Sequence, residues 1–282
     1  MVESNALSRI AVIGGGKMGE AMLGGWIAAG EGPAAAISGA AVAVADPGEE
    51  RRAYLEERYG VSCVPDAREL APADLVVLSV KPQVMMGMLA TIRDLPAFGA
   101  ETAPLYVSVA AGISTARLEE ALPYGARVVR VMPNTPLLVG AGASVVAGGS
   151  CATERDVELV RDLFAALGEA SIVDEADIDA IGAVSGSGPA YVAAMIEALR
   201  DAGAACGLDA AFAERLALQT VYGTARLMRE TGQSAEQTRI AVCSPGGTTL
   251  AALAAMDEAG LSQAYAAGVN AAVVRSKELG AC

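Results

Sequence analysis

The first half of the chain alternates short apolar, β-branched runs with segments of helical periodicity. This alternation is typical of a parallel sheet covered by helices. The predicted strands are Arg9–Ile13, Ala41–Ala45, Leu75–Val80, Leu105–Val109 and Arg127–Val131, with weaker candidates at Val61–Val64 and Ala143–Ala147. The predicted helices are Lys17–Ala29, Glu49–Tyr59 and Thr115–Leu122, and Thr153 followed by Asp156 indicates a further helix start.

From Asp174 onward the strand pattern disappears, and helical patterns follow one another between Gly, Ser and Pro. The predicted helices are Ile178–Val184, Pro189–Cys206, Ala210–Arg229, Ala235–Val242, Thr248–Ala259 and Ser262–Leu279. Ala, Gly and Leu occur around much of their circumference, which would leave an apolar surface on an isolated domain. We expect part of this surface to be buried against another subunit; a well-packed monomeric bundle is the alternative.

The two patterns predict a Rossmann-type α/β domain over residues 1–170 and an all-α domain over residues 171–282. Apolar residues make up 53% of the chain and aromatic residues only 4%, so Ala, Val, Leu and Met must build the core. The formal net charge of −13 argues against a nucleic-acid partner, because phosphate binding needs clustered Lys and Arg. No basic amphipathic segment or long uncharged stretch predicts contact with a membrane.

The residue types that are missing or scarce restrict the chemistry. The sequence contains no histidine, which excludes an imidazole base and a His-ligated metal. Its five cysteines are widely scattered, which fits reduced thiols and predicts neither disulfides nor a metal site. The segment Met1–Asn5 lacks a signal-peptide pattern, so we expect a cytoplasmic location.

A glycine-rich turn follows the first predicted strand directly. Gly14 to Gly19 matches G-x-G-x-x-G, the fingerprint of dinucleotide binding between a strand and a helix. In that fingerprint the first glycine permits a tight turn, the second lets the pyrophosphate approach, and the third lets the helix pack on the strand. The predicted cofactor contacts in this turn are Gly14, Gly16, Lys17, Met18 and Gly19. The alternative is a glycine-rich turn without a ligand.

Asp46 ends the second predicted strand, where the group that meets the adenosine ribose commonly lies. A carboxylate there would accept hydrogen bonds from the ribose diol and favour NAD. Arg51 and Arg52 follow closely and would instead clamp the 2′-phosphate of NADP. Asp46 with Glu49 and Glu50 would also suit an ordinary helix start. The choice between NADH and NADPH stays open.

Two further loops end predicted strands on the side where α/β sheets bind ligands. Val80, Lys81 and Pro82 follow one strand, and Asn134 follows another. We expect these residues to contact the cofactor, although Pro and Asn are also favoured in ordinary turns.

A second glycine-rich loop precedes a late helix. Ser244-Pro-Gly-Gly-Thr-Thr249 leads into an apolar run. The glycines allow close approach of a ligand, and the first N–H groups of the helix have no intrahelical partner, so the loop suits a small carboxylate. The predicted substrate contacts are Ser244, Gly246, Gly247, Thr248 and Thr249. A plain turn and an N-terminal helix cap are the alternatives.

These motifs, taken in order, resemble those of the pyrroline-5-carboxylate reductase family over almost the whole chain. The matching pieces are Gly14 to Gly19, Val80-Lys-Pro82, Ser108-Val-Ala-Ala-Gly112, Val131-Met-Pro-Asn-Thr-Pro136, Gly186-Ser-Gly-Pro-Ala-Tyr191 and Ser244 to Thr249. The most specific are the fifth and the last. Two departures from the family pattern are Lys17 in the first loop and Arg239 to Cys243 ahead of the last.

The resemblance implies a Rossmann domain, a helical dimerisation domain, and a homodimer that assembles into a higher oligomer. The implied reaction is hydride transfer from NADPH or NADH to the C=N bond of 1-pyrroline-5-carboxylate, giving L-proline, with Thr249 at the ring nitrogen. A protonated cyclic imine is already electrophilic, so orientation matters more than acid–base strength, which suits a chain without histidine. The alternatives are a β-hydroxyacid dehydrogenase, which needs a lysine in the helical domain where only Lys277 is available, and a non-catalytic dinucleotide sensor.

Overall fold

The computed structural model describes residues 7–29, 42–99 and 103–281 and divides into two compact units. Unit 1 comprises Met1–Ser187 with Ala272–Cys282, and unit 2 comprises Gly188–Ala271. The boundary between the two units thus follows residue 187, whereas the sequence pattern predicts a domain boundary near residue 170. Met1–Asn5, Ala41 and Cys282 lie outside the described residues.

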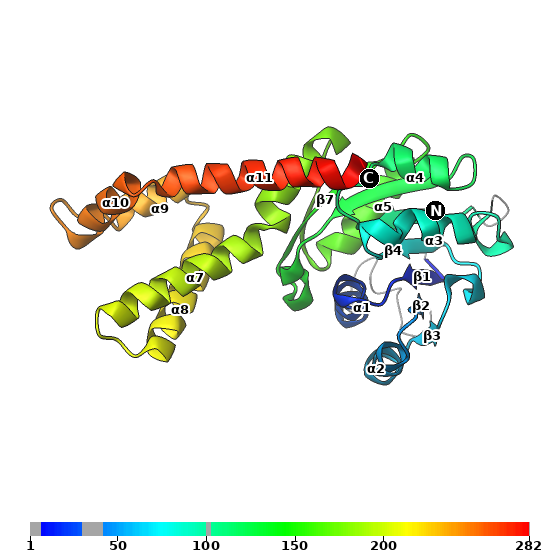
Figure 1. The fold of residues 1–282 in the computed structure, drawn as a ribbon, viewed down its shortest axis with the longest axis horizontal. Coiled ribbons are helices and arrows are strands. Elements are labelled where there is room, and N and C mark those ends of the chain that lie inside the picture. Colours follow the sequence, from blue (N-terminus) through cyan, green and yellow to red (C-terminus); the bar gives the residue numbers. More distant parts are fainter. Residues whose placement is uncertain (1–6, 30–41, 100–102, 282) are drawn as a thin grey trace. The chain divides into compact units, whose positions relative to one another are not determined.

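Within the described residues, unit 1 contains one eight-stranded sheet in the order β3-β2-β1-β4-β5-β6-β7-β8 (Figure 1). The strands are β1 Ile10–Ile13, β2 Val42–Ala45, β3 Ser62–Val64, β4 Leu75–Leu78, β5 Leu105–Ser108, β6 Arg127–Met132, β7 Gly142–Gly148 and β8 Gly168–Ile172. Neighbouring strands run parallel except β6 and β7. The strand order reverses between β1 and β4, and the crevice beyond their carboxyl ends is where such sheets bind ligands.

Helices connect the strands and cover both faces of the sheet. The helices of unit 1 are α1 Lys17–Ala29, α2 Glu49–Tyr59, α3 Pro82–Ile92, α4 Thr115–Ala121, α5 Glu154–Ala165 and α6 Ile178–Ile181. Short 3₁₀ turns are η3 Ala67–Glu69, η4 Pro96–Phe98, η5 Thr135–Val139 and η6 Glu175–Asp177, and η7 Gly182–Gly186 is a π-turn.

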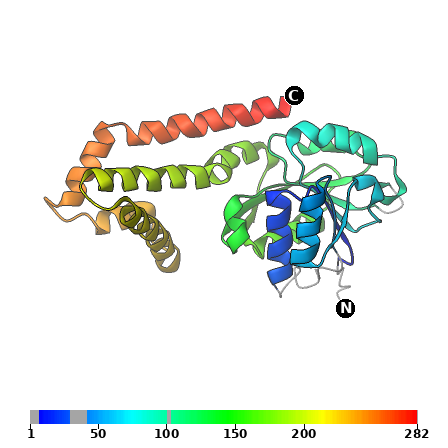
Figure 2. The same cartoon turned by 60° about the horizontal axis from the view of Figure 1, so that its bottom comes forward.

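The strand side chains alternate between two hydrophobic clusters, as the period of a strand requires. Ile10 and Val12 of β1 pack on one face with residues of α1, α2 and α5. Ala11 and Ile13 pack on the other face with residues of α3 and α4. Figure 2 shows the helices of unit 1 on both sides of the sheet. The result is a three-layer sandwich that fixes the carboxyl edge of the sheet.

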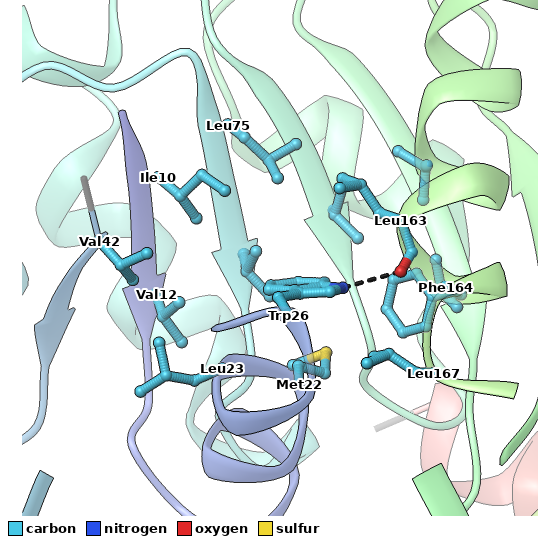
Figure 3. Close-up of a cluster of buried hydrophobic side chains, with 14 of the residues drawn as sticks. Ile10, Val12, Met22, Leu23, Trp26, Val42, Leu75, Leu163, Phe164 and Leu167 are labelled. Atoms are coloured by element: carbon cyan, nitrogen blue, oxygen red, sulfur yellow. Dashed lines mark hydrogen bonds between the residues drawn. The ribbon is translucent and has the colours of Figure 1, made fainter. Parts of the chain in front are cut away.

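Trp26 joins α1 to α5 in the first of these clusters (Figure 3). Its indole Nε1 donates to the carbonyl of Leu163 at 2.8 Å, and its ring meets Phe164 edge-on with centroids 5.8 Å apart. A buried indole therefore keeps its one donor satisfied, as a polar atom in a core must. The contact holds the first helix of the dinucleotide fingerprint against the sheet.

The predicted Rossmann-type fold is confirmed, with two elements missed. The sequence pattern predicts a loop at Val80 to Pro82 and no helix after it, although Pro82 at the first position of α3 is a helix-start signal. The strand β4 also ends at Leu78, before the predicted Val80. The strand β8 was missed because Gly168–Ile172 is a sheet-edge segment without an apolar run. The capping box of Thr153 with Asp156 is present at the start of α5.

Unit 2 is all-helical, as predicted. Its helices are α7 Gly188–Ala205, α8 Ala210–Thr231, α9 Ala235–Ala241 and α10 Thr248–Glu258, and α11 Leu261–Ala281 begins there and ends in unit 1. Ser234 and Gln237 form a capping box at the start of α9. Only Ala213, Ala217 and Thr238 are buried in this unit, whereas Leu216, Leu218 and Tyr222 of α8 are exposed. Unit 2 therefore lacks a hydrophobic core of its own.

None of the helices in the described ranges has the length and apolar character needed to cross a bilayer.

Candidate active site

The glycine-rich turn between β1 and α1 has the geometry that its fingerprint predicts. Gly14 has a φ of 102°, and a Cβ there would lie 2.5 Å from the carbonyl oxygen of Ser79. A Cβ on Gly19 would run into the carbonyl of Gly14. Gly16 is exposed with open space above it, which leaves room for a ligand. The turn therefore fits a pyrophosphate, and no residue larger than glycine fits at either end of it.

Lys17 and Met18, the two residues that follow Gly16, differ in their exposure to solvent. Lys17 is the first residue of α1, and its side chain is exposed at the turn. Met18 is half-buried and packs against the core cluster of α1. The position of Lys17 suits an anionic pyrophosphate, whereas core packing already accounts for the side chain of Met18.

Asp46 lies directly after β2 and is bound to the turn. Its Oδ2 accepts from the amide of Gly15 and its Oδ1 from the amide of Gly48, each at 2.9 Å. Two hydrogen bonds from amides hold the carboxylate at the carboxyl edge of the sheet, where the ribose position was predicted.

The side chain of Arg51 is also bound to the turn. It donates to the carbonyls of Gly15 and Gly16 and forms an ion pair with Glu20 of α1. Burial raises the pKa of Glu20, but hydrogen bonds from Arg51, Tyr54 and Tyr59 outweigh burial and hold the pKa below its ordinary value. Arg51 therefore stabilises the turn as an internal counter-ion. The sequence could not reveal this role, since the partners are about 35 residues apart in the chain.

A groove of about 640 Å³ lies at the switch between β1 and β4. It is lined by Gly14 at the end of β1, Ala45 and Pro47 at the end of β2, and Val80 and Gln83 after β4. Three segments that the sequence predicts near the cofactor, at the ends of β1, β2 and β4, thus surround this groove. Its location beyond the carboxyl ends of parallel strands is where a dinucleotide binds in this fold.

Of the residues predicted after β4, Val80 lines this groove, Lys81 is the exposed N-cap of α3, and Pro82 begins that helix. Sequence reasoning missed Ser79. Its hydroxyl is buried without a hydrogen-bond partner among the described residues, and it lies beside the closely packed backbone of Gly14 and Gly19. This buried hydroxyl packs beside the glycine-rich turn and is not among the residues that line the groove.

Asn134 is buried and its side chain is used by the fold itself. Its amide nitrogen donates to the carbonyl of Ser185 at 3.0 Å, and its oxygen accepts from the amide of Ala143 at 2.8 Å. Ser185 belongs to the π-turn η7, in which the amide of Ser187 bonds to Gly182. Such turns leave carbonyls to be satisfied from outside. The side chain of Asn134 therefore joins η7 to β7, and any cofactor contact would fall to its backbone.

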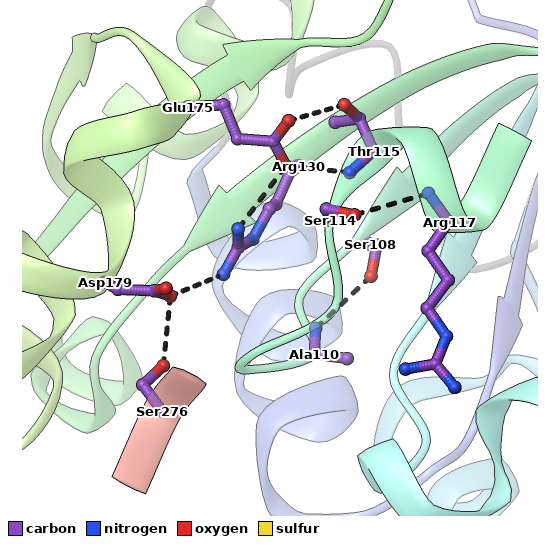
Figure 4. Close-up of polar contacts among 9 residues, drawn as sticks. All are labelled: Ser108, Ala110, Ser114, Thr115, Arg117, Arg130, Glu175, Asp179 and Ser276. Carbon is purple, nitrogen blue, oxygen red and sulfur yellow. Dashed lines mark hydrogen bonds and ion pairs between the residues drawn. The ribbon is translucent and has the colours of Figure 1, made fainter. Parts of the chain in front are cut away.

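A polar network that the sequence did not indicate surrounds Arg130 of β6 (Figure 4). The buried guanidinium pairs with Glu175 at 3.3 Å and with Asp179 of α6 at 3.0 Å. Glu175 accepts from the amide and hydroxyl of Thr115 at the start of α4, and Asp179 accepts from the hydroxyl of Ser276 in α11. One arginine thus joins α4, α6 and α11 to the sheet through its two carboxylate partners.

The loop from Ser244 to Thr249 lies in unit 2 and forms a tight turn. Gly246 has a φ of 68°, and the amide of Gly247 donates to the carbonyl of Ser244 at 3.0 Å. With proline and glycine at its centre this is a type II turn. It leads into α10, whose first amide bonded to a preceding carbonyl is that of Ala251.

The amides available to an anion are therefore those of Gly246, Thr248, Thr249 and Leu250, for which no backbone acceptor is present among the described residues. The amide of Gly247 donates to the carbonyl of Ser244 within the turn, so this residue shapes the loop and has no free amide to offer a ligand. Ser244 and Thr248 are exposed, and Thr249 is half-buried. This geometry is that of an anion-binding helix start.

Comparison with known proteins agrees with these features. A family model described as pyrroline-5-carboxylate reductase dimerisation matches residues 175–279, and one described as NADP oxidoreductase coenzyme F420-dependent matches residues 9–112. The pyrroline-5-carboxylate reductase of Corynebacterium melassecola is 42% identical, covering 97% of this chain and 99% of that protein. This chain belongs to the pyrroline-5-carboxylate reductase family. The family member of a Synechocystis strain is 41% identical, covering 96% of this chain and 98% of that protein.

Solved structures of the family have the same fold over the whole chain. The pyrroline-5-carboxylate reductase of Coxiella burnetii superposes with a TM-score of 0.86 at 36% identity, covering 98% of this chain and 99% of that one. The pyrroline carboxylate reductase of Plasmodium falciparum, solved with NADP bound, gives 0.84 at 29% identity, covering 96% and 98%.

Proposed function

We infer that this chain is a pyrroline-5-carboxylate reductase, which reduces the C=N bond of 1-pyrroline-5-carboxylate with NADPH or NADH and forms L-proline, the last step of proline biosynthesis. Full-length identity of 35–42% to proteins of that name supports this activity. The observation that carries the inference is the joint presence of a dinucleotide turn in unit 1 and an anion-binding helix start in unit 2.

The residues of the β1–β4 crevice fit a nicotinamide dinucleotide. Gly14 and Gly19 close a turn that no side chain can enter, Gly16 leaves space above it, and the hydroxyl of Ser79 is unsatisfied. Gly14, Gly16 and Lys17 would hold the pyrophosphate, and Asp46 and Val80 would flank the adenosine. When bound, the cofactor supplies the hydride.

The loop before α10 would hold the substrate. Its free amides include those of Gly246, Thr248 and Thr249, which suit the ring carboxylate, and each charged hydrogen bond contributes about 1.5–3 kcal/mol. These hydrogen bonds would fix the position of the ring carbon that accepts the hydride. Such positioning is the main requirement for reducing a protonated imine.

The hydroxyl of Thr249 would hydrogen-bond to the ring nitrogen. Its neighbours supply no imidazole, because the chain has no histidine. The imine carries its proton before reduction, so the nitrogen receives an electron pair from the breaking π-bond and becomes the neutral amine of proline. Thr249 orients this nitrogen and accepts no net proton.

The helical domain, residues 171–282 in our assignment, would pair two copies of the chain. The near absence of buried residues in unit 2 and the match to a dimerisation model support a homodimer. We propose further that such dimers assemble into a higher homo-oligomer in the cytoplasm.

A direct assay tests the function. Purified protein with NADH or NADPH is mixed with 1-pyrroline-5-carboxylate, and oxidation of the cofactor and formation of L-proline are followed; an acyclic keto acid is the control. Proline formation with the cyclic imine alone is expected. Binding of dinucleotide without turnover would favour a sensor, and oxidation of a β-hydroxyacid would favour a β-hydroxyacid dehydrogenase.

A further inference from the structure

We propose that Asp46 makes this enzyme prefer NADH to NADPH, by accepting hydrogen bonds from the adenosine ribose hydroxyls and repelling the 2′-phosphate. The proposal rests on the proposed function, since it concerns the cofactor of that reaction. It depends on three features of the edge of the sheet at β2.

The first feature is how Asp46 is held. Each of its carboxylate oxygens accepts one amide hydrogen bond, from Gly15 and from Gly48, so the side chain has one defined position beside the glycine-rich turn. A carboxylate offers about four acceptor sites, so roughly two remain for a ribose diol. The side chain is half-buried and therefore still accessible to a ligand. A free 2′-hydroxyl can donate to it, whereas a phosphate cannot.

The second feature is that the nearby arginines already have partners. Arg51 donates to the carbonyls of the glycine-rich turn and pairs with Glu20. Arg52 donates to the carbonyls of Asp46 and Pro47 at 2.8 and 2.9 Å. NADP sites of this fold use an arginine at this position to receive the 2′-phosphate. Here both guanidinium groups already donate hydrogen bonds to backbone carbonyls, which keep them in place and stabilise the turn.

The third feature is the charge of the groove. Its described lining contains one acidic residue, Asp66, and neither Lys nor Arg. Hydrogen bonds from the side chain and amide of Arg68 lower the pKa of Asp66 to about 2, so this carboxylate is charged in any ordinary assay. A 2′-phosphate carries about 1.5 to 2 further negative charges near neutral pH. Because Arg68 already pairs with Asp66 at 2.6 Å, the described lining of the groove offers no unpaired cation that could receive this phosphate.

Kinetics with both cofactors test the proposal. The wild-type kcat/KM for NADH is expected to exceed that for NADPH by at least about 10-fold, because like charges side by side are strongly unfavourable. Asp46→Asn keeps the size and removes the charge, and it should move the NADH-to-NADPH ratio toward NADPH by about 10-fold. Glu49→Gln, an exposed carboxylate in the first turn of α2, removes the same charge elsewhere and should leave the ratio unchanged.

Calorimetric titration with NAD⁺ and NADP⁺, without substrate, gives a readout that does not depend on turnover. The dissociation constants should change in the same ratio as the kinetics. A wild-type preference for NADPH overturns the proposal, as does an unchanged ratio in Asp46→Asn, or a ratio that responds to Arg52→Met and not to Asp46→Asn. If neither cofactor is oxidised by the cyclic imine, the proposed function fails, and the titration still decides the role of Asp46.

Discussion

At the scale of single residues, two glycines of the dinucleotide turn differ in what they require. Gly19 packs on the carbonyl of Gly14, whereas Gly16 has no heavy atom within 4 Å of the position of a Cβ. Within one motif, Gly19 is therefore required by the packing of the fold, and Gly16 by the space that a ligand needs.

This difference predicts opposite results for two alanine substitutions. Gly19→Ala should lower the free energy of unfolding by about 1–3 kcal/mol, since the new methyl group must displace backbone. Gly16→Ala should leave the melting temperature nearly unchanged and weaken dinucleotide binding. Thermal unfolding and calorimetric titration measure the two effects. Equal stability of both variants would contradict the assigned packing.

Thr249 provides the test of the substrate loop. Thr249→Ala should lower kcat/KM for the cyclic imine by about 10- to 100-fold, the effect of one hydrogen bond to a charged group. The melting temperature should change little, because Thr249 is only half-buried and no side-chain hydrogen bond caps the start of α10. Thr249→Ser keeps the hydroxyl and should retain most activity. Full activity of the alanine variant would remove Thr249 from the mechanism.

The residue types along the sequence predict where the site lies. The role of each side chain depends on its contacts within the fold. Gly14, Asp46 and Val80 follow β1, β2 and β4 at the carboxyl edge of the sheet, where ligands of α/β sheets gather, and their contact with the cofactor stays a prediction. The bonds of Arg51 to Gly15, and of Asn134 to Ser185, link segments far apart in the chain. A local sequence pattern cannot reveal hydrogen-bond partners that are far apart in the chain.

At the scale of elements, helices that carry their own signals were predicted well. The capping boxes at Thr153 and Ser234 lie within four consecutive residues, so sequence is sufficient to find them. The strand β8 is defined by its pairing with β7, and the π-turn η7 by its contact with Asn134. Both depend on tertiary structure.

The network around Arg130 holds several of these elements together. Arg130→Met would leave Glu175 and Asp179 without their cation, and breaking a buried pair in this way costs about 3 kcal/mol. The matched control is Arg226→Met, which breaks an exposed pair with Glu230 and should leave the stability nearly unchanged. Chemical denaturation measures both. Similar values for the two variants would show that the network does not stabilise unit 1.

At the scale of the whole molecule, unit 2 needs a partner to bury its apolar side chains. Leu218 is 57% exposed on α8, although it is a large aliphatic residue in a helical unit without a core. We expect the wild type to be at least dimeric by light scattering, with a melting temperature that rises with concentration.

A charge at the apolar face should disrupt this assembly. Leu218→Asp is expected to reduce the dimer and lower the melting temperature. Tyr124→Asp places the same charge at a fully exposed aromatic residue of unit 1 and should change neither. A wild-type monomer whose melting temperature does not depend on concentration would contradict the dimer.

The central claim is that amides at the start of α10 hold the substrate carboxylate while the β1–β4 crevice holds the cofactor. A crystal structure with L-proline and oxidised cofactor tests it most directly. The account predicts the proline carboxylate within hydrogen-bond distance of the amides of Thr248 and Thr249, with the dinucleotide on Gly14 to Gly19. Proline bound away from residues 244–249 would contradict it.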